Sequence, residues 1–203
     1  MGVINDYPIS TQETDLWDLF RQGNQTAYTE LVRRYAKPLF NYGYRFHQNE
    51  ALIEDCIQQL FHDLWERRER IGATPAVKGY LFKAMRHRVF REQQNWNRHQ
   101  ELDEQYDFLV DFSIESKLIE DTNIVTLNSR VTKVLNELPA RHREVLYLRF
   151  FEDLDFTQIE QVMSINRQSV HNLLQRAYKS FKASWTIMSI WGYILIRLAK
   201  LFY

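Results

Sequence analysis

The chain has little of several residue types, and each shortage excludes a class of protein. Its 203 residues contain one cysteine, Cys56, so an internal disulfide is excluded and a reducing cytosol is the expected compartment. Prolines number four and glycines six, and no long segment alternates with period two; helical periodicity dominates, which predicts an all-α fold. The N-terminus, MGVINDYPIS, lacks the charged start and apolar core of a secretion signal, so none is expected.

A formal net charge is also lacking, because 26 basic and 26 acidic residues balance. The balance is uneven along the sequence. Residues 98–125 hold 2 basic and 8 acidic residues. By contrast, residues 1–97 hold 13 basic and 12 acidic residues, and residues 126–185 hold 9 basic and 6 acidic residues. This pattern indicates two basic regions around an acidic connector, which the neutral total conceals.

Apolar residues at helical spacing predict two groups of helices. The expected helices cover residues 11–21, 25–47, 50–68, 77–97, 124–137, 140–152, 156–163 and 167–185. The acidic stretch from Arg98 to Asp121 has weak periodicity and is expected to be a flexible linker. The predicted organisation is two small helical domains joined by that linker, with the boundaries 11–97 (N-terminal domain), 98–125 (acidic linker), 126–185 (C-terminal domain) and 186–203 (apolar tail).

The stretch from Asp155 to Lys182, DFTQIEQVMSINRQSVHNLLQRAYKSFK, is typical of a helix-turn-helix. Asp155 and Gln158 are spaced as a capping box at the start of the first helix, and Asn166 is a good N-cap for the second. In such motifs a small residue and a glycine are common where Glu160 and Ser164 stand, so we expect a slightly more open turn. The apolar stripe of the second helix is expected at Val170, Leu173, Leu174, Ala177, Tyr178 and Phe181.

The opposite face of that second helix is basic, with four Lys/Arg and no acidic residue between Asn166 and Trp185. The first turns of such a helix enter the major groove, where arginine suits guanine and asparagine or glutamine suits adenine. An ordinary amphipathic helix with a solvated basic face is the alternative. The candidate DNA-binding residues are Arg167, Gln168, Ser169, His171, Asn172, Arg176 and Lys179.

Two further helices of the N-terminal domain carry distinctive surfaces. Residues 66–97 hold eight basic and three acidic residues, interleaved with the aromatics Tyr80, Phe82, Phe90 and Trp96. Basic side chains bind phosphates and aromatic rings can stack on unpaired bases, although some of these rings are needed for the core. The helix at 50–68 has an apolar stripe opposite an acidic and amide face, which is either a solvated surface or a docking face for a protein partner.

Two blocks together resemble the RNA polymerase sigma factors of the small, two-domain extracytoplasmic-function group. IEDCIQQLFHDLWER followed by VKGYLFKAMRHRVFREQQ is similar to the polymerase-binding helix and the promoter-melting helix of that family. LNELPARHREVLYLRFFEDLDFTQIEQVMSINRQSVHNLLQRAYKSFK resembles its C-terminal domain. The order and spacing of the blocks make the resemblance specific over residues 14–97 and 126–185.

The resemblance implies roles for these residues. The helix at 50–68 would grip the clamp helices of the largest subunit of core RNA polymerase, and the C-terminal domain would read the −35 element and meet the polymerase flap. The loop from Arg70 to Ala76 would capture a flipped base, and an anti-sigma protein, often membrane-bound, is expected. The implied polymerase-binding residues are Asp55, Gln58, Gln59, Phe61, Leu64 and Trp65. Those implied to meet the −10 element and its separated strand are Lys78, Tyr80, Lys83, Arg86, His87 and Arg91.

Other motifs are weak. His62 and Glu66 are four apart on a helix, but no third ligand follows at metal-site spacing. No glycine-rich phosphate loop and no nucleophile elbow is present, so we expect no catalytic residue, metal, cofactor or small-molecule substrate. The tail 186–203 is apolar but interrupted by Arg197 and Lys200, which argues against a membrane span. We expect it to pack on the protein or a partner and to tune polymerase binding, with a surface membrane anchor as the alternative.

Three functions compete. The first is a promoter-recognising sigma factor, the second a one-component transcription regulator that uses residues 1–120 as a sensor, and the third a helical adaptor that does not bind DNA. A sigma factor binds core polymerase without DNA, a regulator binds duplex DNA alone, and an adaptor shows no steep salt dependence.

Overall fold

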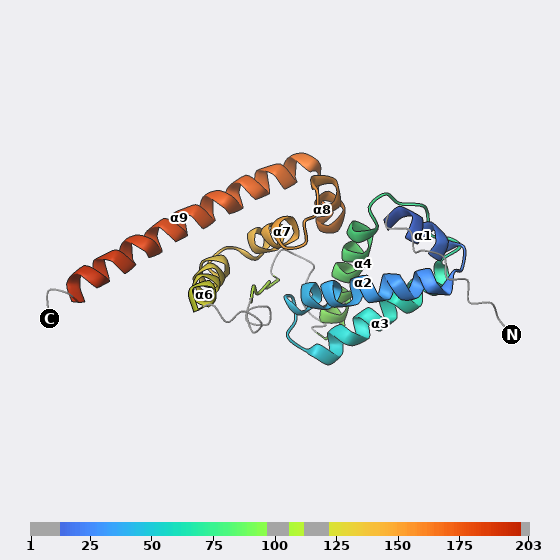
Figure 1. Ribbon diagram of the computed structural model, residues 1–203. Coiled ribbons are helices and arrows are strands. Elements are labelled where there is room, and N and C mark those ends of the chain that lie inside the picture. Colours follow the sequence, from blue (N-terminus) through green and yellow to red (C-terminus); the bar gives the residue numbers. More distant parts are fainter. Residues whose placement is uncertain (1–12, 97–105, 112–121, 200–203) are drawn as a thin grey trace. The chain divides into compact units, whose positions relative to one another are not determined.

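The computed structural model describes residues 13–96, 106–111 and 122–199, and every described element is a helix (Figure 1). The chain forms two compact units, one of residues 1–104 with 161–164, the other of residues 105–160 with 165–203. The all-α prediction is confirmed. In order, the helices are α1 Glu13–Arg21, α2 Gln25–Tyr44, α3 Glu50–Arg67, α4 Val77–Trp96, α6 Thr122–Asn136, α7 Ala140–Phe150, α8 Phe156–Met163 and α9 Arg167–Ala199.

Asparagine caps begin two of the long helices in the first unit. The Asn24 side chain accepts a hydrogen bond from the Ala27 N–H at 2.9 Å, and Asn49 accepts one from the Leu52 N–H at 3.2 Å. Each cap satisfies one of the N–H groups that has no partner inside its helix. These local signals place the starts of α2 and α3 before any tertiary contact is considered.

The core of the first unit forms where α2, α3 and α4 pack on one another and α1 closes against α2 and α4. It is rich in aromatic residues, and Trp17, Phe20, Tyr42 and Phe82 are fully buried. Tyr42 packs against Phe82 with ring centroids 5.0 Å apart. Burying rings of this size supplies much of the hydrophobic stabilisation of a small domain. The core also contains Leu16, Leu31, Leu39, Ile53, Leu81, Met85 and Val89.

In the second unit, α7 packs on α9 and α6 packs on both. Its core contains Val134, Leu138, Val145, Leu148, Leu154, Ile159, Val170 and Ala177. Phe108 and Val110 belong to the same core, although they come from the stretch expected to be a flexible linker. Residues 106–111 are therefore part of the second unit. The remainder of that expected linker, 98–105 and 112–121, lies outside the described residues.

Most expected helix boundaries agree with the structure to within three residues, but the last helix does not. Its expected end is residue 185, whereas α9 continues without interruption to Ala199 (Figure 1). The start of the apolar tail is thus a continuation of the second helix of the helix-turn-helix. No described helix is long and apolar enough to cross a membrane. The predicted role of the tail in packing rests on side chains beyond Thr186, which lie outside the described ones.

Candidate nucleic-acid interfaces

The helix-turn-helix begins with the predicted capping box. The Gln158 N–H donates to Asp155 Oδ1 at 2.8 Å, and the Asp155 N–H donates to Gln158 Oε1 at 3.0 Å. Two N–H groups at the start of α8 are thereby satisfied reciprocally. Ile159, Val162 and Met163 are buried and form the apolar face of α8.

The turn after α8 is closed by a left-handed residue. Ser164 has φ 53°, and the Ile165 N–H donates to the Glu160 carbonyl at 3.2 Å. This six-residue closure is the common Schellman ending of a helix, in which glycine usually takes the left-handed position. The expectation of a more open turn is therefore wrong, because Ser164 adopts the glycine conformation and accepts its steric cost.

The Asn166 side chain accepts a hydrogen bond from the Ser169 N–H at 2.8 Å, which confirms the predicted N-cap of α9. Beyond this cap the first turns of α9 expose their polar side chains, while Val170 and Ala177 face the core. A helix N-terminus also carries a partial positive charge that favours phosphate. The exposed residues are Arg167, Gln168, His171, Asn172, Arg176 and Lys179, with Ser169 half-buried among them.

Neighbouring side chains order this surface. Gln168 Nε2 donates to Asn172 Oδ1 at 3.1 Å, so the two amides form a coupled pair along the helix. The His171 ring stacks on Phe156 with centroids 6.2 Å apart, and Phe156 in turn lies under the guanidinium of Arg149 at 6.0 Å. Arg149 also donates to the Leu154 carbonyl at 2.9 Å. Because these contacts connect α7, α8 and α9, the basic face of α9 is held in a defined orientation.

His142 on α7 lies near the same face. Burial, and secondarily the charge of Arg176, lower the pKa of His142 below its usual range. The imidazole therefore stays neutral near pH 7, and it adds no charge that would repel Arg176. No local pattern in the sequence singles out His142, since nothing around it indicates that it lies beside Arg176.

In the first unit, α4 presents a second cationic surface. The Lys78 ammonium lies 5.6 Å from the centroid of the Phe82 ring. The Arg86 guanidinium lies 4.6 Å from the centroid of the Phe90 ring. Such cation–π contacts orient the charges without neutralising them. Tyr80 is 36% exposed and packs edge-on against Trp17 with centroids 5.4 Å apart.

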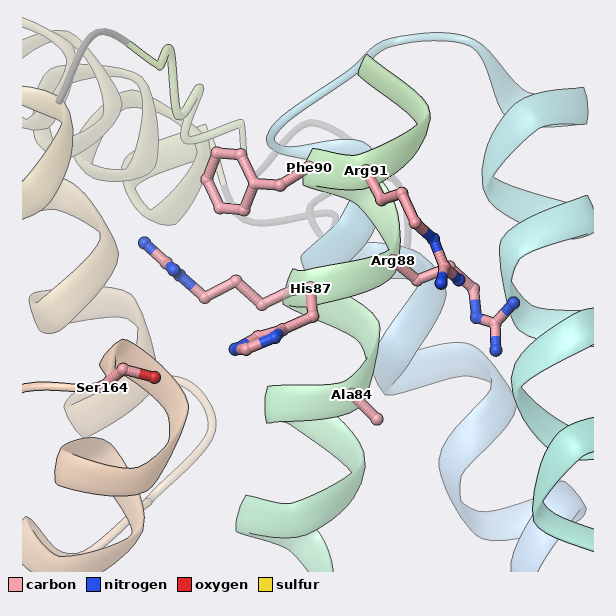
Figure 2. A pocket seen from close by; sticks show the side chains of 7 residues that line it. Ala84, His87, Arg88, Phe90, Arg91 and Ser164 are labelled. Carbon is pink, nitrogen blue, oxygen red and sulfur yellow. The ribbon is translucent and has the colours of Figure 1, made fainter. Parts of the chain in front are cut away.

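His87 has an exposed side chain on α4. Its pKa is lowered, mainly because the ring is partly removed from water and secondly because Lys83 and Arg86 are positively charged. Figure 2 shows His87 and Phe90 extending from one side of α4 and Arg88 and Arg91 from the other. The structure thus brings Lys83, Arg86 and His87 together, but it turns Arg91 toward the side of Arg88. Arg88 belongs to the basic segment 66–97, but its side chain is hydrogen-bonded to α3. Its guanidinium donates to Asp63 Oδ2 at 2.6 Å and to Gln59 Oε1 at 3.0 Å.

The acidic and amide face of α3 carries three of the implied polymerase-binding residues. Asp55, Gln58 and Gln59 are exposed. Trp65 is half-buried, with its ring 4.9 Å from that of Tyr28. Phe61 and Leu64 are 4% and 5% exposed and belong to the core, so they are not available as a surface in this structure. Helical periodicity places both residues on the apolar stripe of this helix, whereas the family resemblance implied a contact with polymerase.

The loop between α3 and α4 is held by α1. The Trp17 indole N–H donates to the Gly72 carbonyl at 3.1 Å, and Arg21 Nε donates to the Ile71 carbonyl at 2.7 Å. A Cβ added at Gly72 would meet no atom within 4 Å, so the space beside the loop is open. Trp17 and Arg21 therefore position this loop, and no local signal in the sequence marks either of them. Across the described residues, no three His, Cys, Asp or Glu side chains are grouped to hold a metal ion.

Comparison with known families gives two separate matches. Residues 31–97 match the family model of sigma-70 region 2, and residues 129–181 match that of sigma-70 region 4. Together the two models match more than half of the chain. The order of the two matches is that of the two sequence blocks.

Two relatives come from Bacillus subtilis strain 168. RNA polymerase sigma factor SigV is 37% identical over 54 residues, which is 27% of this chain and 32% of SigV. The ECF RNA polymerase sigma factor SigM is 21% identical over 154 residues, which is 76% of this chain and 92% of SigM. The chain thus matches about a third of SigV and nearly all of SigM.

Two solved structures have a similar fold. CnrH in complex with the cytosolic domain of CnrY superposes with a TM-score of 0.57 and 18% identity, over 84% of this chain and 94% of that one. RpoE from Bartonella quintana, in complex with the anti-sigma factor NepR, superposes with a TM-score of 0.57 and 15% identity. The match covers 79% of this chain and 97% of that one. At such identities the likeness concerns the fold.

Proposed function

This chain belongs to the sigma-70 family, in its extracytoplasmic-function group, and from that premise we propose how its helices divide the work of promoter-specific transcription initiation. A sigma factor binds core RNA polymerase and directs it to promoters through −35 and −10 elements. The observation that carries the assignment of residues is the exposed start of α9, where cationic and amide side chains follow the Asn166 cap and no acidic residue occurs.

In this proposal α9 reads the −35 element in the major groove. Arg167, Gln168, His171 and Asn172 lie in the first two turns and meet base edges. Arg176 and Lys179 lie further along and contact phosphates, which sets the register of the helix on the duplex without reading sequence. Ser169, half-buried near the N-cap, supports the helix start.

The first unit takes the −10 element and the polymerase. Lys78, Lys83, Arg86 and His87 on α4 approach the backbone of the separated strand, and Tyr80 offers the edge of an exposed ring to a base. The loop Arg70 to Ala76, anchored by α1, receives the flipped base. Arg91 contacts the same strand beyond the surface around His87.

Core polymerase docks on α3 through its exposed polar face. Asp55, Gln58 and Gln59 supply the polar contacts to the clamp helices, and Trp65 supplies an aromatic edge. Phe61 and Leu64 support this face from the core. The second unit meets the flap of the polymerase, as the family resemblance implies.

An anti-sigma protein is the other partner that we propose. The structures of CnrH and of RpoE are complexes, with CnrY and with the anti-sigma factor NepR respectively. A protein that occupies the α3 or α9 surfaces would keep this chain from polymerase or promoter. We further propose that the chain performs no catalysis, requires no cofactor and acts with polymerase in the cytoplasm.

Run-off transcription with purified core polymerase and a pool of genomic fragments tests the proposal. The chain should produce discrete promoter-specific products, and core polymerase alone should not. Asp55→Arg should abolish them and also abolish binding to core polymerase in the absence of DNA. Glu137→Arg is the matched control, since it makes the same charge change at an exposed position of the second unit and should leave docking through α3 unchanged.

The outcomes separate the three candidate functions. Products that depend on Asp55 support the sigma assignment. Tight binding to duplex DNA with no affinity for polymerase would point instead to a one-component regulator. Absence of both activities, with no dependence of any binding on salt, would leave only the helical adaptor.

A further inference from the structure

Residues 106–111, YDFLVD, form an extended strap on the second unit, although they lie within the stretch expected to be a flexible linker. Phe108 and Val110 are 0% and 1% exposed, while Asp107 and Asp111 on either side of them are exposed. Alternate burial of this kind is what an extended segment shows when one of its faces packs on a core. The strap lies between two stretches of chain, 97–105 and 112–121.

Asn136, at the end of α6, holds the strap by its backbone. Its side-chain oxygen accepts from the Val110 N–H at 2.9 Å, and its amide nitrogen donates to the Val110 carbonyl at 2.8 Å. The amide thus pairs with both polar groups of one residue, as a neighbouring strand would. Burial of Val110 is possible because its backbone groups are satisfied in this way.

Helix α7 holds the strap through charged and aromatic side chains. Arg143 donates to Asp107 Oδ1 at 2.5 Å and to the Asn136 carbonyl at 3.0 Å. Its guanidinium therefore links the strap to the end of α6. The Tyr106 hydroxyl donates to the buried Glu144 carboxylate. Phe108 packs edge-on against Tyr147 with ring centroids 5.7 Å apart.

The docked strap shortens the tether between the two units. With the strap in place, nine residues, 97–105, separate α4 from Tyr106, whereas 25 residues, 97–121, separate α4 from α6. A backbone spans at most about 3.5 Å per residue, so the limits on these two gaps are about 35 Å and about 90 Å. Two promoter elements about twenty base pairs apart are separated by about 70 Å of duplex at about 3.4 Å per pair.

We propose that residues 106–111 are a releasable strap, which stays on α6 and α7 in the free protein and leaves them when the two units engage separated promoter elements. The inference rests on the proposed function. Release lengthens the tether and lets each unit bind its own element, while docking keeps the tether short. Because the strap is six residues long and buries the two apolar side chains Phe108 and Val110, simultaneous binding of both units can displace it.

Hydrogen exchange of the strap amides tests this on the full-length chain. In the free protein the Val110 N–H should exchange slowly, because Asn136 accepts its hydrogen bond. In the complex with core polymerase and a promoter fragment recovered by run-off transcription, exchange over 106–111 should accelerate about tenfold or more, while the buried amides of α7 stay protected. Fast exchange in the free protein, or unchanged protection in the complex, would overturn the proposal.

Variants separate release from simple damage to the fold. Asn136→Ala should free the strap amides in the unbound chain and raise the affinity of the holoenzyme for a promoter severalfold, because the cost of release has been removed. Glu137→Ala, at the neighbouring position, should do neither. Phe108→Ser provides a second release variant that leaves α6 intact. Lower promoter affinity in both release variants, with α7 amides still protected, would contradict the proposal.

The same samples distinguish this inference from the proposed function. If transcription occurs while the strap amides remain protected in the complex, the strap proposal alone fails. If no promoter-specific product forms, the proposed function itself fails.

Discussion

The guanidinium of Arg88 on α4 lies 2.6 Å from Asp63 Oδ2 on α3, and this ion pair joins the proposed DNA-melting helix to the proposed polymerase-docking helix. Arg88 is mostly buried, since its side chain is 11% exposed, whereas that of Asp63 is 44% exposed. The same guanidinium also reaches Gln59, a residue of the proposed docking face. One arginine of the basic segment 66–97 thus contacts two polar side chains of α3, one of which belongs to the proposed docking face.

The pair predicts a pH-dependent contribution to stability. The hydrogen bond from Arg88 lowers the pKa of Asp63 in the folded protein. A carboxyl with a lowered folded pKa stabilises the fold above its unfolded pKa of about 3.9, and the contribution is lost as pH falls through the folded pKa. Asp63→Asn should therefore cost at most about 1 kcal/mol at pH 7, because the partly exposed pair is screened by solvent.

Urea unfolding of wild type and Asp63→Asn at several pH values measures this contribution. The difference in unfolding free energy should shrink as pH falls below about 4. Asp55→Asn, on the exposed face of the same helix, is the control and should change stability little at any pH. A difference for Asp63→Asn that grows toward low pH would contradict the assignment.

Ser164→Gly should stabilise the protein. Ser164 has φ 53° at the end of α8, a conformation that costs an L-residue about 1–2 kcal/mol and costs glycine little. Glycine also gains entropy in the unfolded chain, so the expected net gain in unfolding free energy is about 1 kcal/mol or less. Thermal unfolding monitored by circular dichroism measures the change.

Ser180→Gly provides the matched control for that variant. Ser180 lies inside α9, where glycine is a poorer helix former than serine by about 0.5 kcal/mol, so the sign should reverse. Equal destabilisation by both substitutions would mean that the left-handed turn contributes no strain.

Two residues of α9 should differ in how they affect promoter binding. Lys179→Ala should weaken binding to all sequences and reduce the slope of log affinity against log salt by about one, because one phosphate contact is lost. Asn172→Ala should cost about 1–3 kcal/mol on the preferred −35 sequence and relax discrimination at one base pair. Fluorescence anisotropy with −35 duplexes at several salt concentrations distinguishes the two effects. If both variants lose affinity uniformly, Asn172 does not read a base.

Trp17→Phe should impair strand opening more than stability. The indole N–H to Gly72 hydrogen bond is lost, while an aromatic ring remains beside Phe20 and Tyr80, so the expected cost in stability is about 1 kcal/mol. Run-off transcription should fall several-fold on duplex promoters. On a template with a pre-opened −10 region, transcription should return toward the wild-type level. Equal loss on both templates would assign Trp17 to folding alone.

Local sequence patterns predicted much of the fold because they act over a few residues. Asp155 with Gln158, and Asn166 alone, have the side chains that satisfy free N–H groups at helix starts, and both caps form as predicted. The exposed basic face at the start of α9 follows from helical periodicity in the same way. These features depend on neighbours within one turn of helix, which the sequence displays directly.

Other features depend on partners far along the chain. The sequence could not show that Arg88 bonds Asp63, 25 residues earlier, or that the Trp17 indole donates to the Gly72 carbonyl. Ser164 takes a left-handed conformation that its residue type disfavours, because the helices on either side require the turn. Each of these outcomes is decided by packing, which has no local signature.

By itself, the sequence determined that the protein is all-α, that its helix-turn-helix is capped and basic, and that it resembles a sigma factor of two domains. Helical periodicity, capping and charge are properties of neighbouring residues, so they can be read without a structure. Only the tertiary structure decided which charged and apolar side chains are available to a partner. Residues 106–111 show the reason: they lie in an acidic stretch expected to be a flexible linker, yet Asn136 and Arg143 satisfy polar groups in them and allow Phe108 and Val110 to be buried.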